Sequence, residues 1–222
     1  MTLHTSPPPG SGAIVAATLR ILDQVMKRHG GQERNHSQIA YDFVEASKFA
    51  FAKRSMLGDD LMDEAIRPDI EKVLNEIKSQ DWMDWVMTNW NEDQTSSNTT
   101  HYGAEFQYVP EDHGTSHISI LGPNGDAVSV TSTVNTYFGS GVMSESTGII
   151  FNNQMDDFST PNTTNNYGIP SSSMNFIKPF KHPMSSMSPS IVVDDQNRVR
   201  FVVGASGGPR IISAVAFVRI LV

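Results

Sequence analysis

The sequence contains no cysteine, which excludes both a disulfide framework and a thiolate metal site. It has no apolar run near the roughly 20 residues that a membrane-spanning helix requires. Its first residues lack a positively charged region followed by an apolar run, so they are not typical of a signal peptide. The seven histidines show no metal-binding spacing, and we expect neither a metal nor a cofactor.

Basic residues are also too few and too scattered to form a stripe. The chain has 16 basic and 24 acidic side chains, a net charge of −8, and the two signs are mixed along it. Nucleic acid is therefore not an expected partner. Three N-x-S/T sequons, at Asn35, Asn98 and Asn162, permit a secreted, glycosylated protein, although chains rich in asparagine and serine also produce sequons by chance.

The first half of the 222-residue chain has the apolar spacing of helices. Three segments place apolar residues on one helical face: 12–31, 35–59 and 67–77. The first ends on two glycines, and the third has proline near its start, both of which suit helix ends. Residues 91–114 are polar and predict a flexible surface linker.

The second half alternates apolar and polar residues with the period of strands. A hairpin is expected from 115 to 134, a strand at 148–153, and a second hairpin within 190–206 that turns at residues 195–197. A hydrophobic helix follows from 209 to the last residue, and its lack of a polar end predicts a shortened chain. The pattern predicts an α+β protein: a helical part, 1–114, and a strand-rich part, 115–222.

The glycine-rich stretch "GASGG" lies between the last strand and this helix. Ser206 fits a nucleophile elbow, but no acid or histidine follows it to complete a triad. A phosphate loop is disfavoured because the stretch has no lysine. Two readings stay open: a plain strand-to-helix turn, or a turn in which Gly207 and Gly208 present backbone N–H groups to a developing oxyanion.

A second candidate is Thr115, which stands at the head of a strand directly after Gly114. A hydroxyl there can attack the unhindered Gly114 carbonyl, and hydrolysis of the resulting ester frees an α-amine. That amine, with an ordinary pKa near 8, then serves as the general base beside the hydroxyl. A Gly-Thr pair is common, so an ordinary loop-to-strand junction remains open, and His113 and His117 are read as structural.

Six motifs in order together resemble the γ-glutamyltransferase, or glutathione hydrolase, family over nearly the whole chain. They are "TSPPPGSGAI", "GTSHISI", "VSVTSTVNTYFGS", "GIIFNNQMDDFS", "PMSSMSPSIVV" and "VVGASGGPRIISAV". The resemblance implies an N-terminal nucleophile hydrolase, a partial αββα sandwich in which helices flank two antiparallel sheets. It implies self-cleavage between Gly114 and Thr115 into the end of a large subunit, 1–114, and a small subunit, 115–222.

The resemblance also implies a role for each matching residue. Those that act on the scissile bond are the nucleophile Thr115, its hydrogen-bond partner Thr133, and the oxyanion glycines Gly207 and Gly208. Those that bind the donor are Asn135, Gln154 and Asp157 for the α-ammonium group, and Ser185 and Ser186 for the α-carboxylate. Some members carry glutamate at the position of Gln154, and Tyr167 corresponds loosely to a lid aromatic.

The implied activity is transfer of the γ-glutamyl group of glutathione and related donors to water, an amino acid or a dipeptide, at the cell surface or outside the cell. Two departures bear on it. The chain is shorter than the family at both ends, and no arginine within 1–114 stands in the context of the family's carboxylate clamp. We therefore expect little turnover from the isolated chain; the alternative is an inactive truncated relative that acts as an interaction or regulatory chain.

Overall fold

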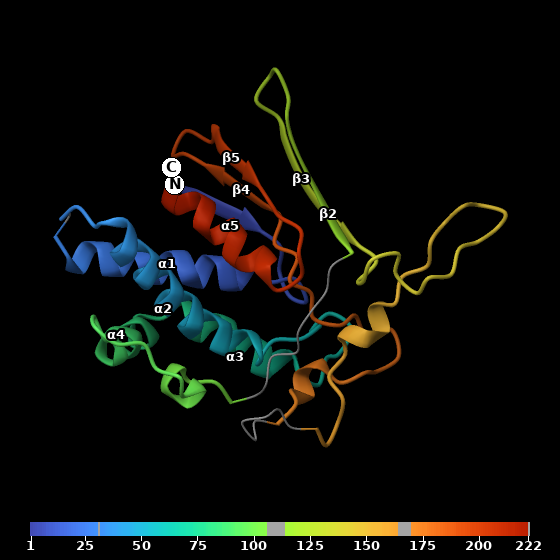
Figure 1. The fold of residues 1–222 in the computed structure, drawn as a ribbon, viewed down its shortest axis with the longest axis horizontal. Coiled ribbons are helices and arrows are strands. Elements are labelled where there is room, and N and C mark those ends of the chain that lie inside the picture. Colours follow the sequence, from blue (N-terminus) through green and yellow to red (C-terminus); the bar gives the residue numbers. More distant parts are fainter. Residues whose placement is uncertain (31, 106–113, 164–169, 222) are drawn as a thin grey trace.

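A computed structural model describes residues 1–30, 32–105, 114–163 and 170–221. The helices lie together with the β4–β5 hairpin (residues 190–203) beside α5 (Arg210–Leu221), a second hairpin projects from the molecule, and long irregular segments lie on the opposite side (Figure 1). The expected α+β composition is confirmed, since helices dominate the first half and strands appear mainly in the second.

The three predicted helices are present. They are α1 (Gly12–Arg28), α2 (His36–Arg54) and α3 (Arg67–Lys78). Asn35 starts α2 with a capping box: its side chain accepts from the Gln38 backbone, and the Gln38 side chain accepts from the Asn35 backbone. These two bonds satisfy N–H groups that have no partner inside the helix.

A fourth helix, α4 (Gln80–Asn89), was not predicted from the sequence. Only Ser79 separates it from α3, and the Ser79 hydroxyl accepts from the backbone N–H of Trp82 to cap it. The helix is short, and Trp82, Met83 and Val86 bury its inner face. With no polar loop before it, the sequence offers no visible boundary between the two helices.

The polar segment after α4 is not wholly the solvated linker that its composition indicates. It forms a short 3-10 helix, η1 (Thr99–Tyr102), whose Tyr102 is only 4% exposed. The Tyr102 hydroxyl donates to the buried carboxylate of Glu45 on α2 at 2.9 Å. Tyr102 therefore ties the segment to the helical core, together with Thr95, which donates to Glu45, and Ser96, which accepts from Lys48.

One sheet has three antiparallel strands in the order β1–β4–β5. The predicted second hairpin supplies β4 (Ser190–Val193) and β5 (Val199–Val203), with a turn in which Asn197 takes a positive φ of 58°. The outer strand β1 (Thr2–Thr5) was not predicted, because four residues are too few to show a period. It brings the N-terminus alongside β4.

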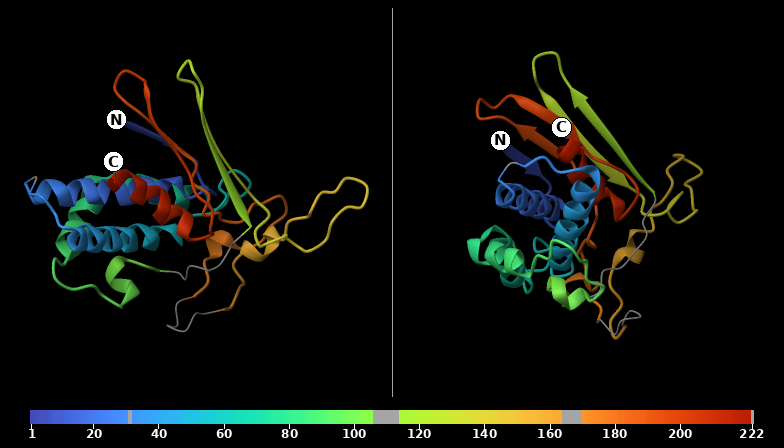
Figure 2. Two further views of the ribbon diagram at one scale, coloured as in Figure 1. Left: turned by 45° about the horizontal axis from the view of Figure 1, so that its top comes forward. Right: turned by 60° about the vertical axis from the view of Figure 1, so that its left-hand side comes forward.

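The first hairpin, β2 (Thr115–Leu121) and β3 (Ala127–Thr133), forms as predicted and projects beyond the helices (Figure 2). Thr115 pairs directly with Thr133 in its register. Ser129 joins this hairpin to the larger sheet: its hydroxyl donates to the Val203 carbonyl and accepts from the Ser190 N–H, both at 3.1 Å.

The strand expected at 148–153 is wrong. Only one isolated bridge, between Met143 and Ile150, forms in this region. Ile149 and Phe151 are at least half exposed, so the apolar pattern here does not reflect packing against a second sheet within the described residues. The chain instead makes a long extended loop that leads into the next polar segment (Figure 2).

The last helix, α5 (Arg210–Leu221), is present as predicted and packs against α1 (Figure 1). Its buried residues are Ile211, Ile212, Val215 and Ala216. Among the described residues, no helix is long and apolar enough to cross a membrane.

Candidate active site

Thr115 lies at the first position of β2 and is 8% exposed. Its hydroxyl donates to the Thr133 hydroxyl oxygen at 3.1 Å, and the backbone N–H of Asn135 donates to the same oxygen at 2.9 Å. Two donors therefore meet on Thr133 Oγ1, which fixes the direction of the Thr115 hydroxyl. Cross-strand pairing of Thr115 with Thr133 makes this contact a direct result of the hairpin register.

Gly114 is held by backbone bonds on both sides. Its N–H donates to the Asn135 carbonyl at 2.6 Å, and its carbonyl oxygen accepts from the Val134 N–H at 3.2 Å. A β-carbon on Gly114 would overlap the carbonyl of Thr136. Glycine is thus required by close backbone approach, in addition to leaving its own carbonyl open.

Asn135 is 2% exposed and has a φ of +75°, a backbone region that asparagine tolerates better than most residues. Its side-chain N–H donates to the Asn153 carbonyl at 3.1 Å. Its Oδ1 accepts no hydrogen bond from any residue that the structure describes. A buried acceptor without a donor is costly, so this oxygen is suited to a ligand N–H.

Gln154 and Asp157 begin and end a short 3-10 helix, η2 (Gln154–Asp157). The Gln154 side-chain N–H donates to the Asp157 carboxylate. The Gln154 backbone N–H donates to Asn152 Oδ1 at 3.0 Å, an Asx-turn of the kind that runs of amides commonly form. The segment thus forms the local turn expected of such a run, and it also contains an acid, Asp157, whose carboxylate is held by the Gln154 side chain.

Asn175, which sequence reasoning missed, links this segment to the serine pair. Its side-chain N–H donates to the Asp157 carbonyl at 2.7 Å, and its Oδ1 accepts from the Met184 N–H at 2.9 Å. Met184 directly precedes Ser185. Asn175 is 7% exposed, and no motif in the sequence marks it, because its two partners lie 18 and 9 residues away along the chain.

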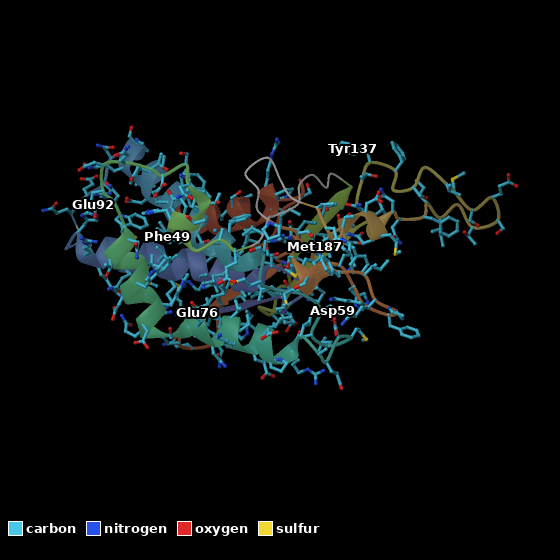
Figure 3. The ribbon with its side chains drawn as sticks, turned by 90° about the horizontal axis from the view of Figure 1, so that it is seen from below. Phe49, Asp59, Glu76, Glu92, Tyr137 and Met187 are labelled. Carbon is cyan, nitrogen blue, oxygen red and sulfur yellow. The ribbon has the colours of Figure 1, made fainter. Side chains whose placement is uncertain are left out.

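Ser185 and Ser186 lie in an extended segment beside the N-terminal turn. The Ser185 N–H donates to the Pro9 carbonyl at 2.8 Å, and its hydroxyl accepts from the Met187 N–H at 3.2 Å. Ser186 is 5% exposed, and Met187 lies among the side chains near the middle of the molecule (Figure 3). Both serines are therefore held by long-range contacts and are more than local turn residues.

Arg54, the last residue of α2, is a buried cation that the sequence analysis did not single out. Its guanidinium donates from Nη2 to the Ser186 hydroxyl at 3.2 Å and from Nε to the Ser11 hydroxyl at 3.0 Å. The side chain is 7% exposed. Its context in the sequence gave no sign of this contact, because Ser186 is 132 residues away.

Gly207 and Gly208 both have positive φ values, +114° and +57°, in the turn that leads into α5. The Gly208 carbonyl accepts from the N–H of Ile211, so the turn is continuous with the helix. Ser206, the residue of the rejected nucleophile elbow, is exposed. The turn begins at Gly204, where a β-carbon would overlap the His117 ring.

The His117 ring therefore lies between β2, which begins at Thr115, and the start of the glycine turn at Gly204. Thr115 and His117 are two residues apart on β2 and share one face of it. The ring contacts the hydroxyls of Thr131 at 2.9 Å and Ser119 at 2.8 Å, and burial lowers the pKa of His117 below its ordinary value. This supports the structural role expected for His117, whereas His113 and Tyr167 lie outside the described residues.

One route of contacts connects most of the predicted residues. It runs from Thr115 through Thr133, Asn135 and Asn153 to the Gln154–Asp157 pair. From Asp157 it passes through Asn175 to the serine segment. The described residues contain no group of three or more histidine, aspartate or glutamate side chains that could hold a metal ion.

Comparison with known proteins points to one family. The sequence model described as Gamma-glutamyltranspeptidase matches residues 1–221. The chain belongs to the γ-glutamyltranspeptidase family. Scoloptoxin SSD14 of Scolopendra dehaani is 42% identical over 218 residues, which cover 97% of this chain and 36% of that protein.

Two further relatives bear the family's names. Glutathione hydrolase proenzyme 2 of Schizosaccharomyces pombe is 36% identical over 218 residues, covering 96% of this chain and 34% of that protein. A crystal structure of a mutant Helicobacter pylori γ-glutamyltranspeptidase is 46% identical, with a TM-score of 0.40, and covers 45% of this chain and 53% of that one. The chain spans about a third of the length of these curated relatives.

Proposed function

We propose that this chain carries the nucleophile and donor-binding residues of a γ-glutamyltransferase and glutathione hydrolase. The observation that carries the proposal is the Thr115 hydroxyl, oriented by Thr133 at 3.1 Å and standing directly after Gly114. The chain's membership of the family supports it.

The first step is self-cleavage. The Thr115 oxygen attacks the Gly114 carbonyl carbon, the C–N bond breaks, and the proton of the hydroxyl passes to the departing amine. The Val134 N–H, which donates to the Gly114 oxygen, stabilises the negative charge that develops there. Water then hydrolyses the Gly114 ester, leaving fragments 1–114 and 115–222.

The freed α-amine of Thr115 then acts as the general base for its own hydroxyl. The hydroxyl attacks the γ-carbonyl of glutathione or a related donor and forms a γ-glutamyl ester, while the amine of cysteinylglycine leaves with a proton. Water, an amino acid or a dipeptide resolves the ester. The backbone N–H groups of Gly207 and Gly208 stabilise the oxyanion in both steps.

Donor recognition follows from the charges of a free amino acid. The donor's α-ammonium group needs acceptors. Asn135 Oδ1, which has no donor among the described residues, and the side chains of Gln154 and Asp157 supply them. The donor's α-carboxylate needs donors, which the hydroxyls of Ser185 and Ser186 supply. No step in this scheme uses a cofactor.

The finer arrangement is part of the same proposal. Residues 1–114 form the end of the large subunit and 115–222 form the small subunit. The three-stranded sheet and the projecting hairpin form part of an αββα sandwich, with helices on its outer faces. The enzyme works outside the cell or at the plasma membrane surface, where glutathione and other γ-glutamyl compounds reach it.

The test is to trap the covalent intermediate. The purified chain is mixed with L-γ-glutamyl-p-nitroanilide, quenched in acid and examined by mass spectrometry of its peptides. We expect one γ-glutamyl group on Thr115, and none in Thr115→Ala. An adduct on Ser206 instead would support the serine nucleophile, and no adduct at saturating donor would support the inactive relative.

A further inference from the structure

Arg54 is a buried cation that joins two segments from opposite ends of the chain. Its Nε donates to Ser11 at 3.0 Å and its Nη2 donates to Ser186 at 3.2 Å. Ser11 is fully buried, and its hydroxyl donates onward to the Ser185 carbonyl at 2.6 Å. One guanidinium thus reaches Ser186 directly and reaches Ser185 through Ser11.

The direction of these bonds matters chemically. Guanidinium only donates, so Ser186 Oγ must act as an acceptor toward Arg54. A hydroxyl oxygen that accepts from a cation is polarised and directs its own hydrogen away from that cation. Hydrogen bonds that involve a charged group are roughly twice as strong as neutral ones. The contact therefore both orients Ser186 and makes its hydroxyl a stronger donor.

The surroundings also hold the serine backbone rigidly. The Ser11 N–H donates to the Met187 carbonyl at 3.0 Å, and the Ser185 N–H donates to the Pro9 carbonyl at 2.8 Å. Two serine hydroxyls in such a fixed segment, with a buried positive charge behind them, make a site suited to a carboxylate. Buried charge acts more strongly here than at the surface, because solvent screening is weaker.

We propose that Arg54 is a positioning residue that orients and polarises the Ser186 hydroxyl toward the α-carboxylate of the γ-glutamyl donor. The inference rests on the proposed function, which assigns that carboxylate to Ser185 and Ser186. Arg54 acts through Ser186, so the two residues form one unit in recognition.

The test measures binding of three ligands to the chain by calorimetry. L-Glutamate has both the α-ammonium and the α-carboxylate, 4-aminobutyrate lacks the α-carboxylate, and glutarate lacks the ammonium. The wild-type chain should bind glutamate more tightly than either analogue. Arg54→Met should reduce glutamate affinity roughly tenfold or more, the scale of one charge-assisted bond, and leave 4-aminobutyrate affinity unchanged.

A double-mutant cycle distinguishes an effect of Arg54 on the Ser186 hydroxyl from a general effect of Arg54 on the stability of the fold. If Arg54 acts through Ser186, the losses from Arg54→Met and Ser186→Ala should not add, and the double variant should resemble either single one. Lys53→Met is the matched control, because it removes the neighbouring cation of α2, whose ammonium pairs with Glu76 and not with the serines. It should retain at least half of the preference for glutamate over 4-aminobutyrate.

Arg54→Lys provides a second variant if Arg54→Met does not fold, as judged by circular dichroism. A single ammonium cannot reach both hydroxyls in the fork geometry of arginine, so the preference for glutamate should still fall. A full preference in a folded Arg54→Met or Arg54→Lys chain would overturn this inference and leave the proposed function standing. No preference for glutamate in the wild-type chain would overturn both.

Discussion

The backbone N–H of Val134 donates a 3.2 Å hydrogen bond to the carbonyl oxygen of Gly114. This oxygen is the carbonyl oxygen of the Gly114–Thr115 peptide bond, the bond that we propose Thr115 cleaves with its own hydroxyl. The hairpin register therefore places the proposed nucleophile Thr115, its acceptor Thr133 and the Val134 N–H around one peptide group. Each of these contacts can be disturbed separately.

Gly114→Ala should slow self-cleavage at least tenfold. The added β-carbon would overlap the Thr136 carbonyl, so the backbone must move and the Gly114 carbonyl must shift away from the Val134 N–H. Cleavage is followed by denaturing gel over time. Gly122→Ala is the control, because a β-carbon there meets its neighbours at ordinary distances of 3.4 Å or more; equal rates in the two variants would contradict the argument.

Thr133→Val should also slow self-cleavage, because the Thr115 hydroxyl loses its hydrogen-bond acceptor. Valine keeps the shape and strand preference of threonine but removes the acceptor of the Thr115 hydroxyl, at a cost of about 1–2 kcal/mol in the barrier. Ser132→Val, on the opposite face of β3 and exposed, is the matched control. If Thr133→Val cleaves as fast as Ser132→Val, Thr133 does not orient the nucleophile.

Local patterns were sufficient to predict the two hairpins, α1, α2, α3 and α5, because each has a clear period and turn residues at its ends. They were insufficient for α4, which follows α3 without a loop, and for β1, which is too short to show a period. The apolar residues at 148–153 predicted a strand that does not form as a regular element. Backbone hydrogen bonds join this stretch to residues 140–144, but among the described residues they amount to one isolated bridge, and the side chains of Ile149 and Phe151 stay exposed.

The candidate site also contains residues that local sequence patterns mark and a residue that they do not mark. The motifs made Thr115, Asn135, Asp157 and the serines candidates, since each stands in a recognisable run of residues, and their roles stay predictions. Arg54 has no such run around it, and its contact with Ser186 depends on the fold, which brings the end of α2 to that residue. Side chains that act across more than 100 residues leave no local signal in a single sequence.

The contact between Gly204 and His117 gives a prediction for the glycine turn. Gly204→Ala should destabilise the chain by about 1–3 kcal/mol, because its β-carbon would overlap the imidazole ring. His117→Ser should also destabilise the chain when made alone. In the double variant, the small serine side chain leaves room for the added β-carbon at position 204, so the total loss of stability should be less than the sum of the two single losses. Urea unfolding of the four proteins measures this coupling, and additive losses would contradict the contact.

Asp63 gives a prediction for acid stability. Its carboxylate is 5% exposed and accepts from Lys178 at 2.9 Å and Lys181 at 3.0 Å. The Lys178 ammonium, helped by Lys181, holds the pKa of Asp63 below its ordinary value. The stability from this group is therefore fully present above about pH 4 and is lost as the pH falls through the lower folded-state pKa.

Asp63→Asn should thus cost about 3 kcal/mol of unfolding free energy at pH 7, because it leaves the buried Lys181 ammonium without its carboxylate. The difference from wild type should shrink steadily as the pH falls below 4. Glu64→Gln, at an 84% exposed side chain, is the control and should change little. A constant difference at every pH would show that the carboxylate charge is not responsible.

The central claim, that Thr115 attacks Gly114, is tested most directly by intact mass spectrometry of the freshly purified chain with and without hydroxylamine. We predict conversion of the 24.4 kDa chain into two fragments that end at Gly114 and begin at Thr115. Hydroxylamine should accelerate this, because it captures the Gly114 ester, and Thr115→Ala should stay whole under both conditions. A wild-type chain that stays whole even in hydroxylamine, or a Thr115→Ala chain that is cut at the same bond, would contradict the account.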